Sequence, residues 1–264
     1  MVNIISLFRI PKLSYRVWKT WMRNKDVFMQ TYKTNFLPSL LEPILYLLAL
    51  GFGLGGFVQP IDGQPYVQFI APALVAVSMM FSSFYECTFA SFVRMYFQKT
   101  FDAIIATPVS IEEVITGEIL WGATKSLINS TIVLVVIALF GVPFTIYFLL
   151  IPPLAFLVGL LFSSLAMCFT AIVPNIDSFN YPNFLLITPM FLLSGTFFPL
   201  TSMPEFIQIV AQTFLPLTNA VIITRSLALA NIQPLILLNL LWIIIVTPLF
   251  FVISINLMKK RLIK

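Results

Sequence analysis

The sequence predicts an all-α integral membrane protein with six transmembrane helices, and three observations lead to this prediction. Of its 264 residues, 59% are hydrophobic and only 9% are charged, a balance that is not typical of soluble domains. Apolar runs near the roughly 20 residues that cross a bilayer as a helix recur along the chain. Basic residues gather at both ends and in one loop. We also expect an N-terminal amphipathic interfacial helix, and short broken or re-entrant outer helices between the fifth and sixth spans.

The six predicted spans are residues 36–57, 66–93, 117–140, 145–173, 182–199 and 233–257. Lys and Arg favour cytoplasmic loops, so the basic residues set the orientation. Of 15 such residues, seven precede Phe36, four follow Leu257, and Arg94 and Lys99 lie between the second and third spans. We therefore expect both termini and the loop 94–116 to be cytoplasmic, in a single transmembrane domain over residues 1–264.

The segment 1–35 carries a regular pattern of cations. Five of them recur at steps of three and four residues: Arg9, Lys12, Arg16, Lys19 and Arg23. This spacing places all five on one face of a helix, with Trp18 and Trp21 toward the other face. Such a helix would lie on the inner leaflet, with its cations facing anionic lipid or a cytoplasmic partner. A simple anchor that fixes the orientation explains the pattern equally well.

The loop 94–116 has the pattern of two capped helices. Thr107-Pro108 would end a short helix, because Pro disfavours the helical conformation of the residue before it. Ser110 and Glu113 have the spacing of a capping box, which would open a second helix that continues into the third span. The loop is thus predicted to form a rigid cytoplasmic elbow.

The elbow also carries apolar residues, namely Phe101, Ile104 and Ile105. A short loop helix has little of its own to cover them, so a partner protein is the expected cover. Packing against the N-terminal helix is the alternative.

The fifth span stops before it completes an ordinary crossing. Ser194, Gly195 and Pro199 interrupt it, and Ser202 and Glu205 have capping-box spacing at the start of a second helix. Backbone broken at membrane depth must be satisfied by protein or by a water-lined cavity. We therefore expect residues 194–232 to pack on the outer side beside a transport path.

The second helix of this segment is predicted to be amphipathic. Its polar stripe consists of Glu205, Gln208 and Gln212, and the opposite face carries Phe206, Ile207, Ile209, Val210 and Phe214. The chain then turns back after Pro216 through a stretch with one cation, Arg225.

Three charged residues lie inside apolar spans, namely Glu42, Glu86 and Lys125. Each uncompensated charge at the bilayer centre costs about 2.5–3.5 kcal/mol on insertion scales. The three fall at similar depths, so we expect Lys125 to pair with Glu86 or Glu42, within the bundle or across a dimer. Independent snorkelling to the interface and a proton relay are the alternatives.

Other sequence features exclude several kinds of chemistry. The chain has no His, which removes His-based catalysis and His metal centres. Cys87 and Cys168 both lie in apolar spans, which favours two reduced, buried thiols. The phosphate-binding loop GxxxxGK[ST] is missing, so the chain is not expected to bind ATP, and no cofactor is expected in it.

Three motifs resemble the membrane subunit of type-2 ATP-binding-cassette exporters, and they occur in the same order. They are Leu41-Glu42-Pro43-Ile44-Leu45-Tyr46 before a glycine-rich stretch, Thr100-Phe101-Asp102 to Ala106-Thr107-Pro108, and Leu193-Ser194-Gly195 to Phe198-Pro199 followed by Leu215-Pro216-Leu217-Thr218 and Arg225. The likeness covers nearly the whole chain. It is closest to the nodulation-type permeases that export lipo-oligosaccharides, although drug and polysaccharide exporters share most of these features.

The resemblance implies a homodimer of permease subunits in a bacterial or archaeal cytoplasmic membrane. Each subunit would rest on a separate ATP-binding-cassette ATPase, which binds ATP and Mg. The elbow residues implied to dock this ATPase are Phe97, Thr100, Phe101, Asp102, Ile104, Ile105, Thr107 and Pro108. The residues implied to form an outer gate are Ser194, Gly195, Phe198, Pro199, Glu205 and Arg225. Membrane lipids are further expected partners, and nucleic acid is not.

The leading hypothesis is a transport subunit, not an enzyme, that moves an amphipathic substrate outward. The substrate could be a lipid-linked glycan, a lipo-oligosaccharide, a lipid or a drug. A stand-alone ion-coupled transporter or channel is the alternative, which is disfavoured because no inverted repeat or midplane acidic cluster is evident. A membrane-embedded transferase is a third possibility, and the lack of His and of a clustered polar motif counts against it.

Overall fold

The computed structural model describes residues 7–61, 63–143 and 145–263, and every named element in these ranges is helical. The longer α-helices are α1 (Val17–Gln30), α2 (Tyr32–Tyr46), α3 (Tyr66–Tyr85), α5 (Ile111–Leu139), α6 (Ile151–Ile172), α9 (Glu205–Phe214), α10 (Pro216–Ala228) and α11 (Ile236–Leu262). The short α-helices are α4 (Thr100–Ile105), α7 (Asn180–Pro182) and α8 (Thr188–Leu193). The π-helical segments are η2 (Leu47–Leu54), η3 (Glu86–Ala90), η4 (Val93–Phe97) and η7 (Asn183–Ile187), and the 3-10 turns are η5 (Ile146–Leu150), η6 (Ile176–Phe179) and η8 (Leu200–Ser202).

Four helical stretches of the described chain are long and apolar enough to cross a membrane. They are Tyr66–Phe97, Ile111–Leu139, Ile146–Ile172 and Ile236–Leu262, and they correspond to the predicted second, third, fourth and sixth spans. Helices α9 and α10 meet at 91° and add a fifth crossing if the bent pair counts as one. Among the described residues, the predicted first span contains the shorter apolar helix Leu40–Leu54, and the predicted fifth span is helical only to Leu193. The protein is an all-helical, multi-pass membrane protein.

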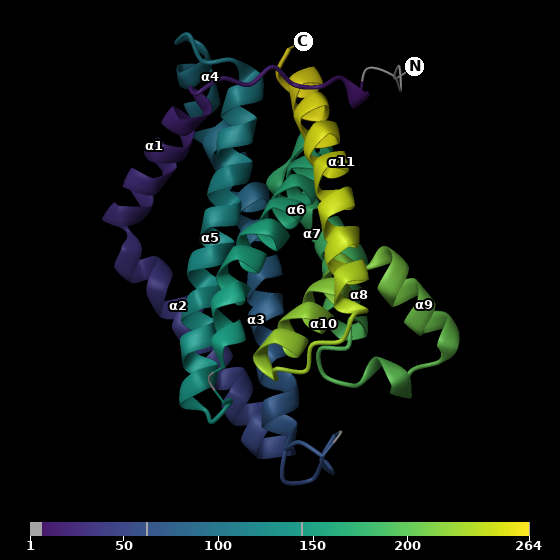
Figure 1. Cartoon of the computed structure of the whole chain (residues 1–264). Coiled ribbons are helices and arrows are strands. Elements are labelled where there is room, and N and C mark those ends of the chain that lie inside the picture. The colour runs from purple at the N-terminus through teal and green to yellow at the C-terminus, as the bar shows by residue number, and fades with distance from the viewer. Residues whose placement is uncertain (1–6, 62, 144, 264) are drawn as a thin grey trace.

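Helix α6 lies at the centre of the bundle, where it packs against α5, α3 and α11. Helices α1 and α2 run along one side of this bundle, and α9 projects from the opposite side (Figure 1). Small residues bring α5 and α6 together, since a Cβ added at Gly159 would lie only 2.6 Å from that of Ser126. Cys87 and Cys168 are free and buried, as predicted.

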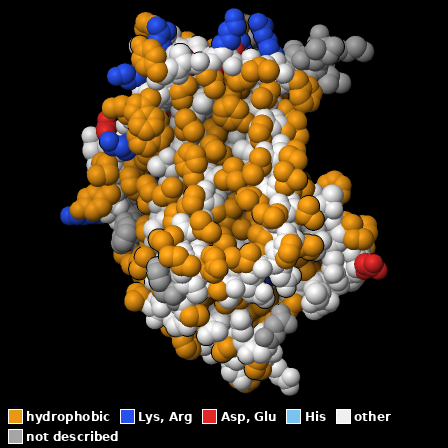
Figure 2. All heavy atoms as spheres, in the orientation of Figure 1, with side chains coloured by type: hydrophobic (Ala, Val, Ile, Leu, Met, Phe, Trp, Pro, Cys, Tyr) orange, Lys and Arg blue, Asp and Glu red, His pale blue; other side chains and the backbone are white. Residues whose placement is uncertain are grey.

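The surface of the molecule shows where its charges gather. Hydrophobic side chains cover most of the middle of the face in Figure 2, and Lys and Arg side chains cluster at the end where α11 finishes. The first described residues lie at this same end, because the Asn256 amide near the end of α11 donates hydrogen bonds to the carbonyls of Leu7 (3.0 Å) and Arg9 (2.8 Å). The two ends of the described chain therefore meet on one side of the bundle.

The prediction that five cations of the N-terminal segment share one helical face is wrong. Helix α1 begins at Val17, so Arg9 and Lys12 lie in the non-helical stretch before it. Pro11 lacks the N–H of a regular helix, and this stretch bonds to other elements instead. The Lys12 N–H donates to the carboxylate of Glu112 at the start of α5. The segment thus crosses the ends of α5 and α11 as a strap.

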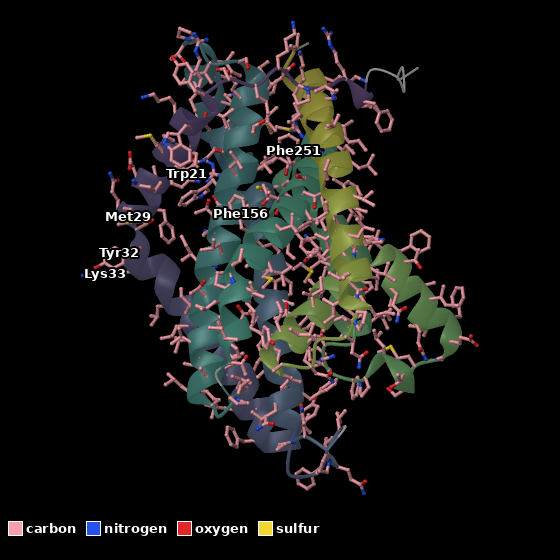
Figure 3. All side chains as sticks on the ribbon, viewed as in Figure 1. Trp21, Met29, Tyr32, Lys33, Phe156 and Phe251 are labelled. Carbon is pink, nitrogen blue, oxygen red and sulfur yellow. The ribbon has the colours of Figure 1, made fainter. Side chains whose placement is uncertain are left out.

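Helix α1 itself packs against α5 through its aromatic face. Trp18 and Trp21 stack with their ring centroids 4.1 Å apart, and Trp21 donates its indole N–H to Thr124 of α5 at 2.9 Å. Figure 3 shows Trp21 on the bundle side of α1, and Tyr32 at the turn into α2 points away from the bundle. Trp21 therefore contributes to the packing of α1 against α5.

The break after the fifth predicted span is present in the structure. Helix α8 ends at Leu193 and residues 194–199 are non-helical. Gly195 has φ +73°, a left-handed conformation that glycine adopts at little cost. The prediction that Gly195 and Pro199 interrupt this span is confirmed.

The capping box predicted for Ser202 and Glu205 is wrong. Ser202 lies in η8 and donates its hydroxyl to the carbonyl of Pro199 at 2.7 Å. Helix α9 starts at Glu205 with Pro204 at its N-cap, and no side chain caps it. Pro204 sets the start of the helix, and Ser202 is already held in the preceding turn, so its side chain cannot reach the first turn of α9.

Candidate functional site

A cavity of about 690 Å³ lies between α1 and α2 on one side and α3, with its extension η3 and η4, and α5 on the other. The cavity runs along α3, η3 and η4 from Leu74 to Gln98. The charged and polar residues that line it are Arg23, Glu42, Ser78, Ser82, Glu86, Arg94, Gln98, Lys125 and Asn129. Aromatic and aliphatic residues complete the wall, namely Val27, Pro43, Tyr46, Leu74, Val77, Phe81, Tyr85, Phe89, Ala90, Val93 and Val133. Its charged groups on η3 and η4 thus lie toward the elbow, and its Leu74 end is apolar.

Two cations and two carboxylates form a connected network at this cavity. Lys125 Nζ lies 2.8 Å from Glu86 Oε2, and Arg94 Nη1 lies 2.8 Å from Glu86 Oε1. Arg94 also contacts Glu118 Oε2 through Nη2 at 2.5 Å and Nε at 3.0 Å. Both carboxylates are buried, with side chains 4% and 1% exposed. The four formal charges sum to zero, which lowers the cost of placing them in an apolar bundle.

Neutral polar side chains also bind the Glu118 carboxylate. The Ser91 hydroxyl donates to Glu118 Oε2 at 2.6 Å, and the Asn24 amide donates to Oε1 at 2.7 Å. Arg23 donates in turn to the Asn24 amide oxygen at 2.9 Å. Burial, followed by the nearby charge of Arg94, lowers the pKa of the Arg23 guanidinium, and Glu118 opposes that shift. The network therefore links α1 to the stretch that contains η3 and η4, and to α5.

The three charges singled out from the sequence are brought to one cavity, but they have different surroundings. The structure pairs Lys125 with Glu86, which selects one of the two predicted partners. Glu42 is exposed to the cavity and has no hydrogen-bond or ion-pair partner among the described residues. From the sequence, Arg94 is used only to orient the loop, and neither Arg94 nor Glu118 is assigned to a charge network. Each lies on the same helical stretch as a charge that was singled out, Arg94 with Glu86 and Glu118 with Lys125. This shared helix is the signal that could have identified them.

The elbow has the predicted helical pattern. Helix α4 ends at Ile105, just before Thr107-Pro108. Glu113 donates its N–H to the Ser110 hydroxyl at 3.3 Å, and Ser110 donates its N–H to the Glu113 carboxylate at 2.7 Å. This capping box opens α5 and is confirmed.

The apolar residues of the elbow are less exposed than the sequence suggested. Phe101 is fully buried in the core of this chain, and Ile104 and Ile105 pack against that core. The expectation that a partner must cover Phe101 is therefore wrong, because η4 and the start of α5 already cover α4. Phe97 is 61% exposed. Of the other expected docking residues, Thr100 is half-buried, and Asp102, Thr107 and Pro108 are exposed.

Arg225 of α10 holds the broken segment to the bundle. It donates through Nη2 to the carbonyl of Gly195 at 2.8 Å and through Nε to the carbonyl of Phe69 in α3 at 3.2 Å. Its guanidinium lies 3.9 Å from the centre of the Phe69 ring. The cation thus satisfies a carbonyl freed by the break, as broken backbone in a membrane requires.

The remaining residues expected at the outer gate have mixed exposure. Ser194 is buried and Pro199 is half-buried, but Phe198 and Glu205 are exposed. On α9, Gln208 donates to the carbonyl of Met203 at 2.8 Å. Three apolar side chains of this helix are exposed, namely Phe206 (76%), Ile209 and Phe214, and Ile207 and Val210 are half-buried. This amphipathic helix therefore presents an apolar face to its surroundings.

Comparison with known proteins identifies the family of this bundle. Residues 15–229 match the model of the ABC-2 type transporter. The chain belongs to this ABC-2 type transporter family. It is 36% identical over 222 residues to Nodulation protein J of Rhizobium meliloti (strain 1021), covering 84% of each chain. It is 34% identical over 242 residues to Nodulation protein J of Sinorhizobium fredii (strain NBRC 101917 / NGR234), covering 92% of each.

A more distant relative extends the similarity beyond the nodulation proteins. The chain is 26% identical over 189 residues to the inner membrane transport permease YadH of Escherichia coli (strain K12), which covers 71% of this chain and 73% of that protein. No solved structure matches the chain significantly. Together, the family match and the permease relative identify this ABC-2 protein as a transmembrane subunit of an ABC exporter. The alternative of a stand-alone ion-coupled transporter or channel is not favoured.

Proposed function

We propose that this ABC-2 permease takes an amphipathic substrate into the cavity between α2 and α3, and that ATP hydrolysis in a separate subunit drives its export across the cytoplasmic membrane. The cavity is the observation that supports the proposal most strongly. Its charged groups on η3 and η4, Glu86 and Arg94, lie toward the elbow, and apolar residues such as Leu74, Val77 and Val133 line its other end. Its volume is within the range of ligand sites, about 300–1,000 Å³. A polar head would bind among the charges, and an apolar chain would lie along α3.

The proposed substrate class includes a lipid-linked glycan, a lipo-oligosaccharide, a lipid and a drug. Each combines a polar head with an apolar part, as the cavity does. Two relatives are named Nodulation protein J, which favours the nodulation-type members of the class.

The proposed assembly is a homodimer of six-span subunits in a bacterial or archaeal cytoplasmic membrane, each a single permease domain over residues 1–264. Helix α1 would lie at the inner leaflet, and residues 194–232 would lie on the outer side. The Lys and Arg residues at the end where both chain ends meet support this orientation (Figure 2). Residues 94–116 would then face the cytoplasm. ATP and Mg would bind to the partner ATPase and not to this chain.

Filling the cavity should stop transport without disturbing assembly. Ser82 lines the cavity and is half-buried, so Ser82→Trp would place a large ring in the path of an apolar chain. We expect the Ser82→Trp complex to be purified intact and to hydrolyse ATP, and to lose most of its export of amphiphiles from vesicles. Thr201→Trp, at an exposed position on η8, is the matched control. Full export by Ser82→Trp would rule out this cavity as the substrate path.

The exposed part of the elbow is the proposed docking surface for the ATPase. Phe97 is a large, exposed apolar side chain of this surface, next to exposed Tyr96, and aromatic anchors that become buried commonly dominate an interface. Phe97→Asp is expected to leave the permease folded but to release the ATPase, with at least about tenfold less co-purified partner, or roughly 1.4 kcal/mol of binding.

The matched control lies four residues further on. Phe101 is fully buried, so Phe101→Asp should reduce the yield of folded permease itself. Undiminished co-purification of the ATPase with well-folded Phe97→Asp permease would contradict the docking role of this surface.

A further inference from the structure

Glu42 is an unusual residue in the cavity wall. It lies on α2 within an apolar stretch, faces the cavity, and has no hydrogen-bond or ion-pair partner among the described residues. A carboxylate inside a membrane protein is costly, and such residues commonly mark the site of a ligand. The structural question is which group compensates its charge.

Aromatic rings line the same cavity as this carboxylate. Tyr46 follows Glu42 by one helical turn on α2, and Tyr85 at the end of α3 lines the same cavity. Tyr85 is the middle ring of a ladder, with 5.5 Å between its centroid and that of Phe81 and 5.9 Å to that of Phe89. All these rings line the cavity.

Two of the three cations that line the same cavity already form ion pairs. Lys125 pairs with Glu86, and Arg94 pairs with both Glu86 and Glu118. This network is neutral by itself, so it offers no surplus positive charge to Glu42. Arg23 also lines the cavity, but it lies on α1 beside Asn24 and near Arg94. Arg94 is more than two helical turns beyond Tyr85 on the helical stretch Tyr66–Phe97.

We propose that Glu42, Tyr46 and Tyr85 bind the positively charged head of an amphiphile, either a quaternary or a protonated amine. The carboxylate supplies the counter-charge, and the ring faces attract a cation through their quadrupoles. The alkyl chain lies along α3 toward Leu74 and Val77. This inference deepens the proposed function, because it names the class of substrate that the cavity takes.

Equilibrium binding tests the site without the need for transport. Radiolabelled octyltrimethylammonium is added to the full chain in lipid nanodiscs, and binding to empty nanodiscs is subtracted. Octyl sulfate and octyl glucoside, which have the same chain but an anionic or a neutral head, serve as competitors. We expect unlabelled octyltrimethylammonium to compete at least about tenfold better than either, as expected for a desolvated cation–π site with a counter-charge.

Variants assign the binding to named groups. Glu42→Gln should weaken octyltrimethylammonium binding about tenfold or more, and Glu42→Asp should restore much of it. Tyr85→Leu should weaken it severalfold, and Tyr85→Phe, which keeps the ring, should not. Glu205→Gln, which removes an exposed carboxylate on α9 outside the cavity, is the control and should leave binding unchanged.

Two outcomes would overturn the site. One is equal binding by wild-type chain and a well-folded Glu42→Gln variant. The other is preferential competition by octyl sulfate, which would assign the head to the cations Arg23 and Lys125 instead. Because binding is measured without the ATPase, a chain that binds octyltrimethylammonium through Glu42 but exports no amphiphile when ATP and the ATPase are present would refute the proposed function and leave the site intact.

Discussion

Arg94→Gln is expected to cost about 3–5 kcal/mol in the free energy of unfolding, because breaking a buried ion pair leaves an uncompensated charge. Arg94 bonds to both carboxylates of the network. Without it, Glu118 has no ion-pair partner among the described residues, and its side chain is only 1% exposed, so water cannot replace the lost partner. Thermal unfolding of the purified chain in detergent measures the effect.

The double variant tests whether charge balance is the cause. Arg94→Gln combined with Glu118→Gln leaves the neutral Lys125–Glu86 pair and should recover much of the lost stability, since replacing both members costs less than removing one. Lys125→Met should destabilise less than Arg94→Gln, because Glu86 keeps Arg94 as a partner. A single Arg94→Gln variant as stable as the wild type would show that the network is not what holds these helices together.

Arg225→Gln is expected to release the broken segment and to cost about 2–4 kcal/mol. Its side chain donates to the carbonyls of Gly195 and Phe69 and lies over the Phe69 ring. Hydrogen bonds to charged groups are worth roughly 1.5–3 kcal/mol each, and the partial exposure of Arg225 reduces the sum. Glutamine is shorter, so it cannot reach both carbonyls.

A reporter on the break distinguishes local release from general unfolding. Ser194 is fully buried beside Gly195. In a Ser194→Cys background, Arg225→Gln should make this thiol react much faster with a water-soluble maleimide below the unfolding temperature, and the buried Cys87 should stay protected. Unchanged protection at position 194 would mean that Arg225 does not hold the segment in place.

Features set by local spacing could be predicted from the sequence. The Ser110–Glu113 capping box depends on residues three positions apart, and it forms as expected. The interruption at Gly195 depends on the conformational freedom of that residue, and it is present. The second, third, fourth and sixth spans are also close to the predicted ranges, because their apolar length alone identifies them.

Features that depend on distant residues could not be predicted. Arg94 lies at the start of a basic loop, which indicates a cytoplasmic cation. In the structure it instead forms an ion pair inside the bundle with Glu118 of α5. Phe101 was expected to be exposed because its own helix is short, yet neighbouring elements bury it completely. The partner of Lys125 could not be chosen because Glu42 and Glu86 have similar depths, and only the packing of α3 against α5 selects Glu86.

The central claim is that this chain moves amphiphiles only with an ATP-hydrolysing partner. The most direct test reconstitutes it into lipid vesicles, with and without the ATPase that co-purifies with it, and follows fluorescently labelled amphiphiles with cationic, anionic and neutral heads. The account predicts movement of at least one of them from the ATP-exposed leaflet, only when both ATP and the ATPase are present. Movement by the chain alone, driven by an imposed proton or sodium gradient, would contradict the account and favour a stand-alone ion-coupled transporter.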